Sequence, residues 1–299
     1  DMKQRREKKD SRRIENFRRI ENKKLVVTVY VLLRLAVILT MVAQIFDGNY
    51  ENVFLCILTL FLFTIPSLVE GWAKIDLPDT LEIIILCFIF AAEILGEIQA
   101  YYVKFPYWDT MLHTMNGFLC AAIGFSLVDL LNRRGHPSLH LSPFYMAVTA
   151  FCFSMTIGVM WEFGEYGMDQ LFLKDTQKDT VITEFSTVML DPTMTNTAVP
   201  VEDIADVIIV HSDGTEEALG LGGYLDVGLH DTMEDLFVNF IGAVVFSTVG
   251  FFFVRSRGKG RFARRFIPRV MPEEGNPPPE GDEAPVLEGG QPENPGPET

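Results

Sequence analysis

The sequence predicts an all-α membrane protein, a six-transmembrane-helix bundle with a small extracytoplasmic β-hairpin cap and a disordered C-terminal tail. Three features predict it: long apolar runs, basic residues gathered beside those runs, and a final segment rich in proline and acid. The chain of 299 residues is 48% hydrophobic and 22% charged, so the charges are concentrated in a few segments. A soluble acidic globule is therefore excluded, in spite of a net charge of −15.

Six segments are apolar enough to cross the hydrocarbon core of a bilayer, which takes about 20 residues of helix. They are residues 25–46, 53–69, 83–102, 110–128, 144–161 and 236–254. A soluble protein can bury one such run, but six in succession indicate a membrane. The predicted membrane domain covers residues 25–255 and includes an outer loop at 170–225.

The basic residues predict the orientation. Residues 1–24 hold eleven of the 25 Lys and Arg, and residues 255–271 hold seven. Because Lys and Arg are enriched on the cytoplasmic side, we expect both termini in the cytoplasm and the outer loop outside. The basic segments, 1–24 and 256–271, are also expected to contact anionic lipid. Their place beside membrane helices explains their charge, so nucleic acid is not expected as a partner.

The outer loop and the tail have different compositions. The loop has ten acids and two lysines, and residues 204–210 and 215–219 flank Ser212-Asp213-Gly214, which is typical of a β-hairpin. We expect this hairpin to form a small cap over the outer mouth of the bundle. Residues 272–299 hold eight acids, eight prolines and no basic residue. Such a segment cannot bury a core, so we expect it to be disordered.

Ionisable residues recur within the predicted helices, where they are costly and indicate a functional site. The carboxylates are Glu93, Glu97, Asp109, Glu162, Glu165, Asp169, Asp231 and Asp235, and the histidines are His113 and His230. Within each helix, members three or four positions apart share a face. Because successive helices run in opposite directions, all of these residues fall near the outer ends. The sequence therefore predicts one polar layer shared by four helices.

The charge balance of this layer predicts a cation. Arg34 is the only formal cation at membrane depth, and close pairs of ionised carboxylates repel one another by on the order of a few kcal/mol. Either several carboxylates are protonated or a divalent metal ion is bound, and its identity stays open. The predicted metal ligands are His113, Glu162, Asp231, Asp235, His230, Asp109 and Glu93. We expect Glu165 and Glu162 to be catalytic and Arg34 to hold an anionic group of the substrate.

Some of these residues have simpler interpretations. Asp109, Asp169 and Glu97 lie near helix ends, where solvation explains a carboxylate equally well. Asp109 could also be a first-turn residue favoured by the helix dipole. Arg34 could pair with a carboxylate and be structural.

Three strings carry a resemblance to a known family. They are Trp108-Asp109-Thr110-Met111-Leu112-His113, Trp161-Glu162-Phe163-Gly164-Glu165 and His230-Asp231-Thr232-Met233-Glu234-Asp235. With these strings the chain resembles the YjdF-type bacterial integral membrane proteins over residues 25–255. The resemblance implies a six-helix protein of the bacterial inner (cytoplasmic) membrane. It implies no activity.

Three functions remain open. The first is a metal-dependent enzyme acting on a lipid or isoprenoid phosphate, because Asp-x-x-x-Asp with nearby His and Asn resembles phosphate–metal chemistry in other membrane enzymes. The second is a cation or proton transporter, since carboxylates at membrane depth form proton relays, although the inner halves of these helices carry no matching polar residues. The third is a non-catalytic sensor or assembly factor whose acidic loop binds a partner.

Overall fold

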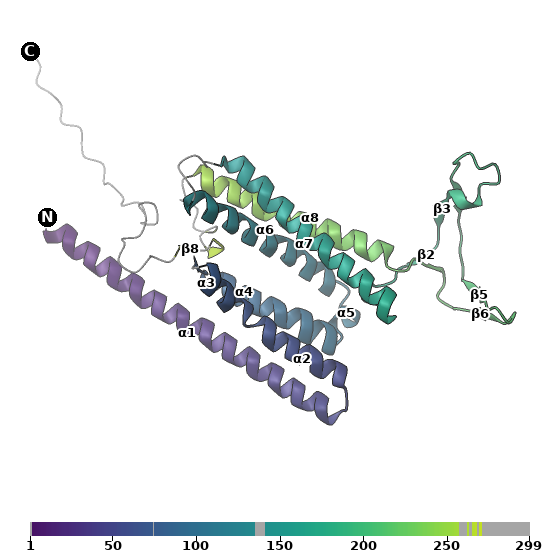
Figure 1. Ribbon diagram of the computed structural model, residues 1–299, viewed down its shortest axis with the longest axis horizontal. Coiled ribbons are helices and arrows are strands. Elements are labelled where there is room, and N and C mark those ends of the chain that lie inside the picture. The colour runs from purple at the N-terminus through teal and green to yellow at the C-terminus, as the bar shows by residue number, and fades with distance from the viewer. Residues whose placement is uncertain are drawn as a thin grey trace, which may run out of the picture.

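The computed structural model describes residues 2–73, 75–134, 141–256, 262, 265–267 and 269–270. Figure 1 shows long helices that run between two ends of the molecule. In chain order, the long and short helices of the described bundle are α1 (Met2–Phe46), α2 (Tyr50–Leu62), α3 (Ile65–Ala73), α4 (Asp79–Phe90), the π-helix η1 (Ala91–Ile98), α5 (Tyr101–Lys104), α6 (Trp108–Arg134), α7 (Pro143–Phe172) and α8 (Leu229–Arg255). The described structure is mostly helical, as predicted.

Five helical stretches of the described chain are long and apolar enough to cross a membrane. They are Lys23–Phe46, Tyr50–Trp72, Trp108–Asn132, Pro143–Phe172 and Leu229–Arg255, and each contains one predicted span. The sixth predicted span, residues 83–102, is not confirmed because the helix there is divided. Helix α4 ends at Phe90, η1 ends at Ile98, and Ala100 has a left-handed φ of 56°. A π-helix has about one more residue per turn than an α-helix, and short π-helical stretches are common at functional sites.

The starts of three helices follow from local chemistry. Ser142 precedes α7 and accepts the N–H of Tyr145, while Pro143 takes the first helical position, where no N–H is needed. The Asn49 side chain caps α2 in the same way. Gly228, with a φ of 82°, lets the chain turn into α8.

Helices α6, α7 and α8 pack as one unit around small residues. A Cβ added at Gly117 would lie 2.1 Å from the carbonyl oxygen of Asn239, and one added at Gly242 would lie 2.1 Å from that of Thr114. The backbones of α6 and α8 therefore approach closely, as small residues allow in membrane helices. Ser154 of α7 donates a hydrogen bond of 2.8 Å to the carbonyl of Gly117. Buried residues of this unit include Ala121, Phe125, Met146, Ala150, Ala243 and Phe246.

Helices α1, α2 and α4 form a second unit with a smaller core. Its buried residues are Val37, Cys56, Phe63, Leu86 and Ile94. Helix α4 also packs on the first unit: its residue Leu81 is buried in the core of α6, α7 and α8. The two units lie on either side of two cavities, and the candidate site occupies one of them.

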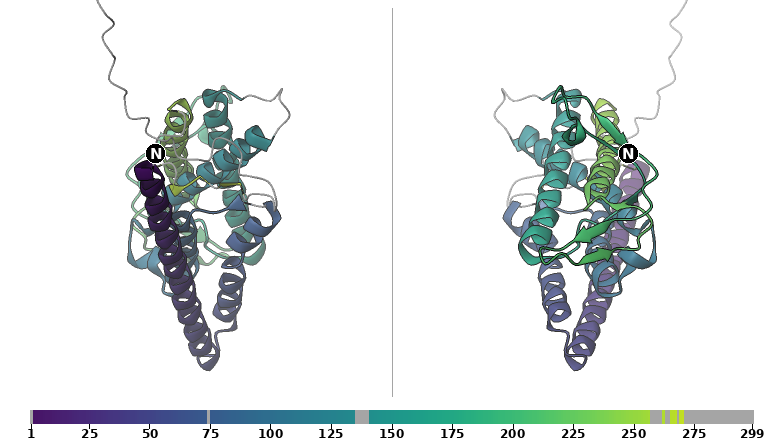
Figure 2. Two further views of the ribbon diagram at one scale, coloured as in Figure 1. Left: turned by 90° about the vertical axis from the view of Figure 1, so that its left-hand side faces the viewer. Right: turned by 90° about the vertical axis from the view of Figure 1, so that its right-hand side faces the viewer.

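Short strands fill the segment between α7 and α8. They are β2 (Val181–Ile182) paired with β7 (Tyr224–Leu225), β3 (Phe185–Thr187) paired with β4 (Val199–Val201), and β5 (Ile208–Val210) paired with β6 (Glu216–Ala218). A short 3₁₀ helix, η2 (Val188–Leu190), follows β3. Figure 1 shows these strands beyond the helix ends where α7 ends and α8 begins, and the right-hand view of Figure 2, seen from that side, draws them in front of the helices. A further pair, β1 (Ile75–Asp76) with β8 (Arg269–Val270), is antiparallel like the others.

The predicted hairpin forms, but the predicted cap is not confirmed. Strands β5 and β6 pair across the Asp213–Gly214 turn and are shorter than the residues expected to form them. Every residue of both strands is exposed, and Figure 1 shows the hairpin extending away from the helix ends. This two-stranded hairpin is not packed against a second layer of the described structure, so its apolar residues stay exposed. The tail predicted to be disordered, residues 272–299, lies outside the described residues.

Candidate functional site

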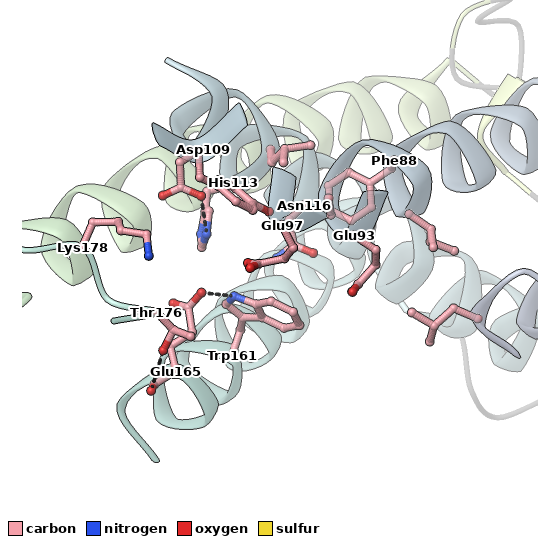
Figure 3. Close-up of a pocket in the computed structure, with 15 residues that line it drawn as sticks. Phe88, Glu93, Glu97, Asp109, His113, Asn116, Trp161, Glu165, Thr176 and Lys178 are labelled. Atoms are coloured by element: carbon pink, nitrogen blue, oxygen red, sulfur yellow. Dashed lines mark hydrogen bonds and ion pairs between the residues drawn. The ribbon is translucent and has the colours of Figure 1, made fainter. Parts of the chain in front are cut away.

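A cavity of about 160 Å³ opens where η1, α6 and α7 come together. Figure 3 shows the side chains that line it. Its polar lining residues are Glu93, Glu97, Tyr102, Asp109, His113, Asn116, Trp161, Glu165, Thr176 and Lys178. We call this space the acidic cavity. Of the predicted polar layer, the residues that line this cavity are Glu93, Glu97, Asp109, His113 and Glu165. The α8 residues of that layer and Glu162 of α7 do not line it.

His113 connects three carboxylates at the wall of the acidic cavity. Its Nε2 lies 3.5 Å from Oδ1 of Asp109 and 3.6 Å from Oδ2 of Asp235, and its Nδ1 lies 3.8 Å from Oε1 of Glu162. These distances exceed those of good N–H···O hydrogen bonds, about 2.7–3.2 Å. His113, Glu162 and Asp235 are 9%, 4% and 3% exposed. The cluster is thus buried and loosely spaced, with room for an ion between its members.

Two groups of side chains could each hold a metal ion. One is His113, Glu162, Glu165 and Asp235, and the other is Asp109, Asp231 and Asp235. Within each group, one donor atom per residue lies within 4.8 Å of the others. Asp235 belongs to both. Carboxylate oxygens with a single imidazole suit hard or borderline divalent cations.

Three carboxylate oxygens of these groups have no hydrogen-bond partner among the residues that the structure describes. They are Oε2 of Glu162, Oε2 of Glu165 and Oδ2 of Asp235, all buried. Leaving a buried carboxylate oxygen unsatisfied is costly, so such atoms call for a compensating proton or cation. Their common location in one ligand group fits a bound cation.

Helical spacing and close packing place these side chains. Asp109 and His113 stand one turn apart on α6, and Asp231 and Asp235 stand one turn apart on α8. On α7, Nε1 of Trp161 donates a hydrogen bond of 2.9 Å to Oε1 of Glu165 and orients that carboxylate.

Asn116 and Asn239 form a pair of amide side chains one helical turn beyond His113 on α6 and Asp235 on α8. Nδ2 of Asn116 donates to Oδ1 of Asn239 at 3.2 Å, and Asn239 is 1% exposed. A Cβ at Gly158 would lie 2.6 Å from the Asn239 amide. Glycine at 158 thus leaves room for the Asn239 side chain between α7 and α8.

Three predicted site residues lie outside both ligand groups. Glu93 lines the acidic cavity but belongs to neither group. His230 is exposed at the start of α8, and its backbone N–H donates to Asp226. Arg34 does not line the cavity: its guanidinium donates to the Leu60 carbonyl at 3.4 Å and lies 4.5 Å from the centre of the Tyr30 ring.

Two loop residues that were not predicted also line the acidic cavity, Thr176 and Lys178. Asp169, which was grouped with the site carboxylates, instead holds this loop: its oxygens accept the N–H groups of Thr176 and Gln177 at 2.7 and 2.9 Å. The Lys178 N–H donates to Oδ2 of Asp231 at 2.8 Å. Lys178 is one of only two lysines in an acidic loop, which is the one signal that could have singled it out.

Comparison with known proteins places the chain among membrane proteins. The model of a family described as predicted membrane protein (DUF2238) matches residues 27–256. No curated protein and no solved structure matches the chain. The matched residues include both ligand groups, the acidic cavity and the segment between α7 and α8.

Proposed function

The chain belongs to the DUF2238 family of predicted membrane proteins, and we propose that it is a metal-dependent membrane enzyme that hydrolyses a lipid or isoprenoid phosphate. The observation that carries the proposal is the pair of ligand groups that share Asp235. In the first group, three buried carboxylate oxygens have no hydrogen-bond partner within the described part of the chain. Divalent cations held by these two groups would offset the carboxylate charge and would satisfy the oxygens of Glu162 and Asp235. The same carboxylates without cations would repel one another.

The reaction is the hydrolysis of a phosphate ester. Water adds to phosphorus, the bond from phosphorus to the lipid oxygen breaks, and an alcohol and inorganic phosphate leave. A divalent cation lowers the pKa of coordinated water and neutralises phosphate charge. Glu165 lines the cavity and is oriented by the hydrogen bond from Trp161 to its Oε1. We assign its buried Oε2 to accept the proton of the attacking water instead of holding the metal.

Lys178 is the cation that we assign to an anionic substrate group, because its side chain lines the acidic cavity. Its ammonium also contacts Asp175, an exposed carboxylate that a phosphate would have to displace. An ammonium group interacts well with phosphate as a point charge. The sequence assigned this role to Arg34, which lies between α1 and α2 beside Tyr30 and Leu60. We therefore assign the anionic group to Lys178.

We place the protein in the bacterial inner membrane with both termini in the cytoplasm. In Figure 1 the start of α1 and the ends of α6 and α8 lie at one end of the molecule. The last residues of α6 and α8 are basic, which supports a cytoplasmic position for that end. The acidic cavity lies toward the opposite end, so its mouth would face outside.

The first experiment measures metal and activity on one purified sample. Wild type in detergent should contain about two equivalents of divalent metal and release phosphate from farnesyl phosphate or a long-chain alkyl phosphate. Asp235→Asn should lose both the metal and the activity. The matched control is Glu234→Gln, which changes an exposed carboxylate on the same helix that belongs to neither ligand group.

Each other outcome rejects a defined part of the proposal. Wild-type protein free of metal, or metal content unchanged in Asp235→Asn, would contradict the metal site. Metal-loaded protein that releases no phosphate from any lipid phosphate would contradict the reaction. Metal-dependent cation flux in liposomes without phosphate release would identify a transporter instead.

A further inference from the structure

A second cavity adjoins the acidic cavity. It has a volume of about 320 Å³ and lies between α2, α3 and α4 on one side and α6 on the other. The two cavities share four lining residues, Leu62, Phe88, Ile89 and Asn116. We call the second space the apolar groove, because most of its walls are Leu, Ile, Val and Phe side chains.

One face of α6 lines both spaces and changes character along its length. Asp109, His113 and Asn116 line the acidic cavity, and Asn116 is followed on the same face by Leu119, Cys120, Ile123 and Leu127 in the apolar groove. These positions are three or four residues apart, so they form one stripe. The stripe is polar toward the start of α6 and mainly apolar from Leu119 to Leu127. Ser126 and Asp129 line the far end of the groove.

The opposite wall makes the same change at the same level. Along α4 and η1, Leu81 and Ile85 line the apolar groove, Phe88 lines both spaces, and Glu93 and Glu97 line the acidic cavity. Helices α4 and α6 run in opposite directions, yet both change from polar to apolar where the spaces meet. The joined spaces therefore match a ligand with a polar head and a hydrocarbon tail.

The dimensions of the apolar groove fit one extended chain. Its α6 wall runs from Asn116 to Leu130, a length of about 21 Å at 1.5 Å per helical residue. The hydrocarbon core of a bilayer is about 30 Å thick, so a lipid chain in one leaflet extends about 15 Å. A chain of that length fits along this wall. A volume of about 320 Å³ is near the lower end for ligand pockets, roughly 300–1,000 Å³, which favours a single chain over two.

The groove can be entered from the side. Ile65, Val69, Ile123 and Leu127 line it and are 37–39% exposed. They lie within stretches long and apolar enough to cross a membrane, so this exposed edge would face lipid. A chain could move from the bilayer into the groove without leaving an apolar environment.

We propose that the apolar groove binds the single hydrocarbon chain of a lipid whose phosphate head lies in the acidic cavity. This inference rests on the proposed function, since carboxylates without cations would repel a phosphate head. The substrate class is then a single-chain lipid phosphate, and the substrate enters the groove between α3 and α6. Chain binding and head binding then depend on different residues.

The test uses photoreactive probes on the full-length protein in nanodiscs. Hexadecyl phosphate and hexadecanol, each with a diazirine in the chain, are crosslinked with and without divalent metal. The phosphate should label groove residues of α4 and α6 only with metal, whereas the alcohol should label them in both conditions. A two-chain phosphatidic acid should compete about tenfold less well than unlabelled hexadecyl phosphate, since the second chain has no groove to enter.

Variants separate the groove from the metal site. Ile123→Trp and Val69→Trp fill the groove from opposite walls and should reduce labelling by both probes about tenfold while metal content stays at the wild-type level. Val245→Trp is the control, because Val245 is exposed on α8 and lines neither space. Asp235→Asn should abolish labelling by the phosphate and leave labelling by the alcohol unchanged.

Other results overturn the inference. Equal competition by one-chain and two-chain lipids would mean that ordinary bilayer lipid fills the groove. Unchanged labelling in both tryptophan variants would mean that the chain binds elsewhere. If the alcohol labels the groove but the phosphate does not do so with metal, the groove binds a chain and the proposed function fails. If wild type binds metal normally and neither probe labels the groove, the metal site stands and this inference fails.

Discussion

Asp235 is the residue on which both ligand groups depend, because one carboxylate contributes to each. His113, by contrast, belongs to one group only. We therefore expect His113→Ala to lower the metal content from about two equivalents to about one, and Asp235→Asn to remove both. Mass spectrometry of the purified variants measures this. Equal metal loss in the two variants would show that the sites are not separable.

Gly242 determines how closely α8 can approach α6. An added Cβ would lie 2.1 Å from the Thr114 carbonyl oxygen, and neither backbone can yield without separating the helices. Gly242→Ala should therefore destabilise the fold by roughly 1–3 kcal/mol, as overpacking does. Thermal unfolding in detergent measures this as a lower midpoint.

Gly164→Ala is the control for that substitution. Gly164 lies on α7, and an added Cβ there would have no atom within 4 Å. A helical Gly→Ala change in open space should be neutral or stabilising by up to about 1 kcal/mol. If both variants unfolded at the same temperature, close approach of α6 and α8 would not be what Gly242 provides.

At the scale of the elements, a carboxylate connects the segment between α7 and α8 to the start of α8. Asp226 accepts the N–H groups of Thr180 at 2.8 Å, Gly228 at 3.2 Å and His230 at 2.7 Å. Partial burial raises the pKa of Asp226, but these three donors outweigh burial and hold the pKa below its ordinary value. The charged form is thus favoured in the folded segment.

The pH dependence follows from that direction. Since the folded-state pKa of Asp226 is lowered, its contribution to stability is fully present above the unfolded-state pKa of about 3.9. It decreases below that pH and is lost once the pH has fallen through the lower pKa of the folded state. Hydrogen exchange at the Thr180 and His230 amides should therefore lose protection on acidification.

Asp226→Asn should expose the same amides at neutral pH. Glu202→Gln changes an exposed carboxylate of the same segment and is the control. Protection that does not change with pH or in Asp226→Asn would show that the strand pair β2–β7 holds the segment without this carboxylate.

At the scale of the whole molecule, the distribution of Lys and Arg predicts the topology. A fluorescent protein fused after Thr299 should fluoresce in the cytoplasm, and an epitope inserted between Ser212 and Asp213 should be labelled from outside the cell. The hairpin turn tolerates the insertion because β5, β6 and the turn are exposed. The reverse pattern would invert the orientation and place the acidic cavity toward the cytoplasm.

The sequence by itself determined where the five described helical stretches that are long and apolar enough to cross a membrane lie, because hydropathy is a local property of the chain. It also indicated the membrane family, and it selected most of the residues that gather at the site. Helical spacing alone puts Asp109 beside His113 and Asp231 beside Asp235. The Asp213–Gly214 hairpin followed from local turn chemistry in the same way.

Only the tertiary structure decided what depends on how helices meet. Packing of α6, α7 and α8 at glycines divides the carboxylates into two groups around Asp235, and it leaves His230 outside them. The return of the loop after α7 brings Thr176 and Lys178 to the cavity, while Arg34 packs against α2. The apolar groove exists only because α4 and α6 stand apart beside the acidic cavity. Contacts between distant segments depend on the shapes of both partners, and no local pattern in one segment specifies them.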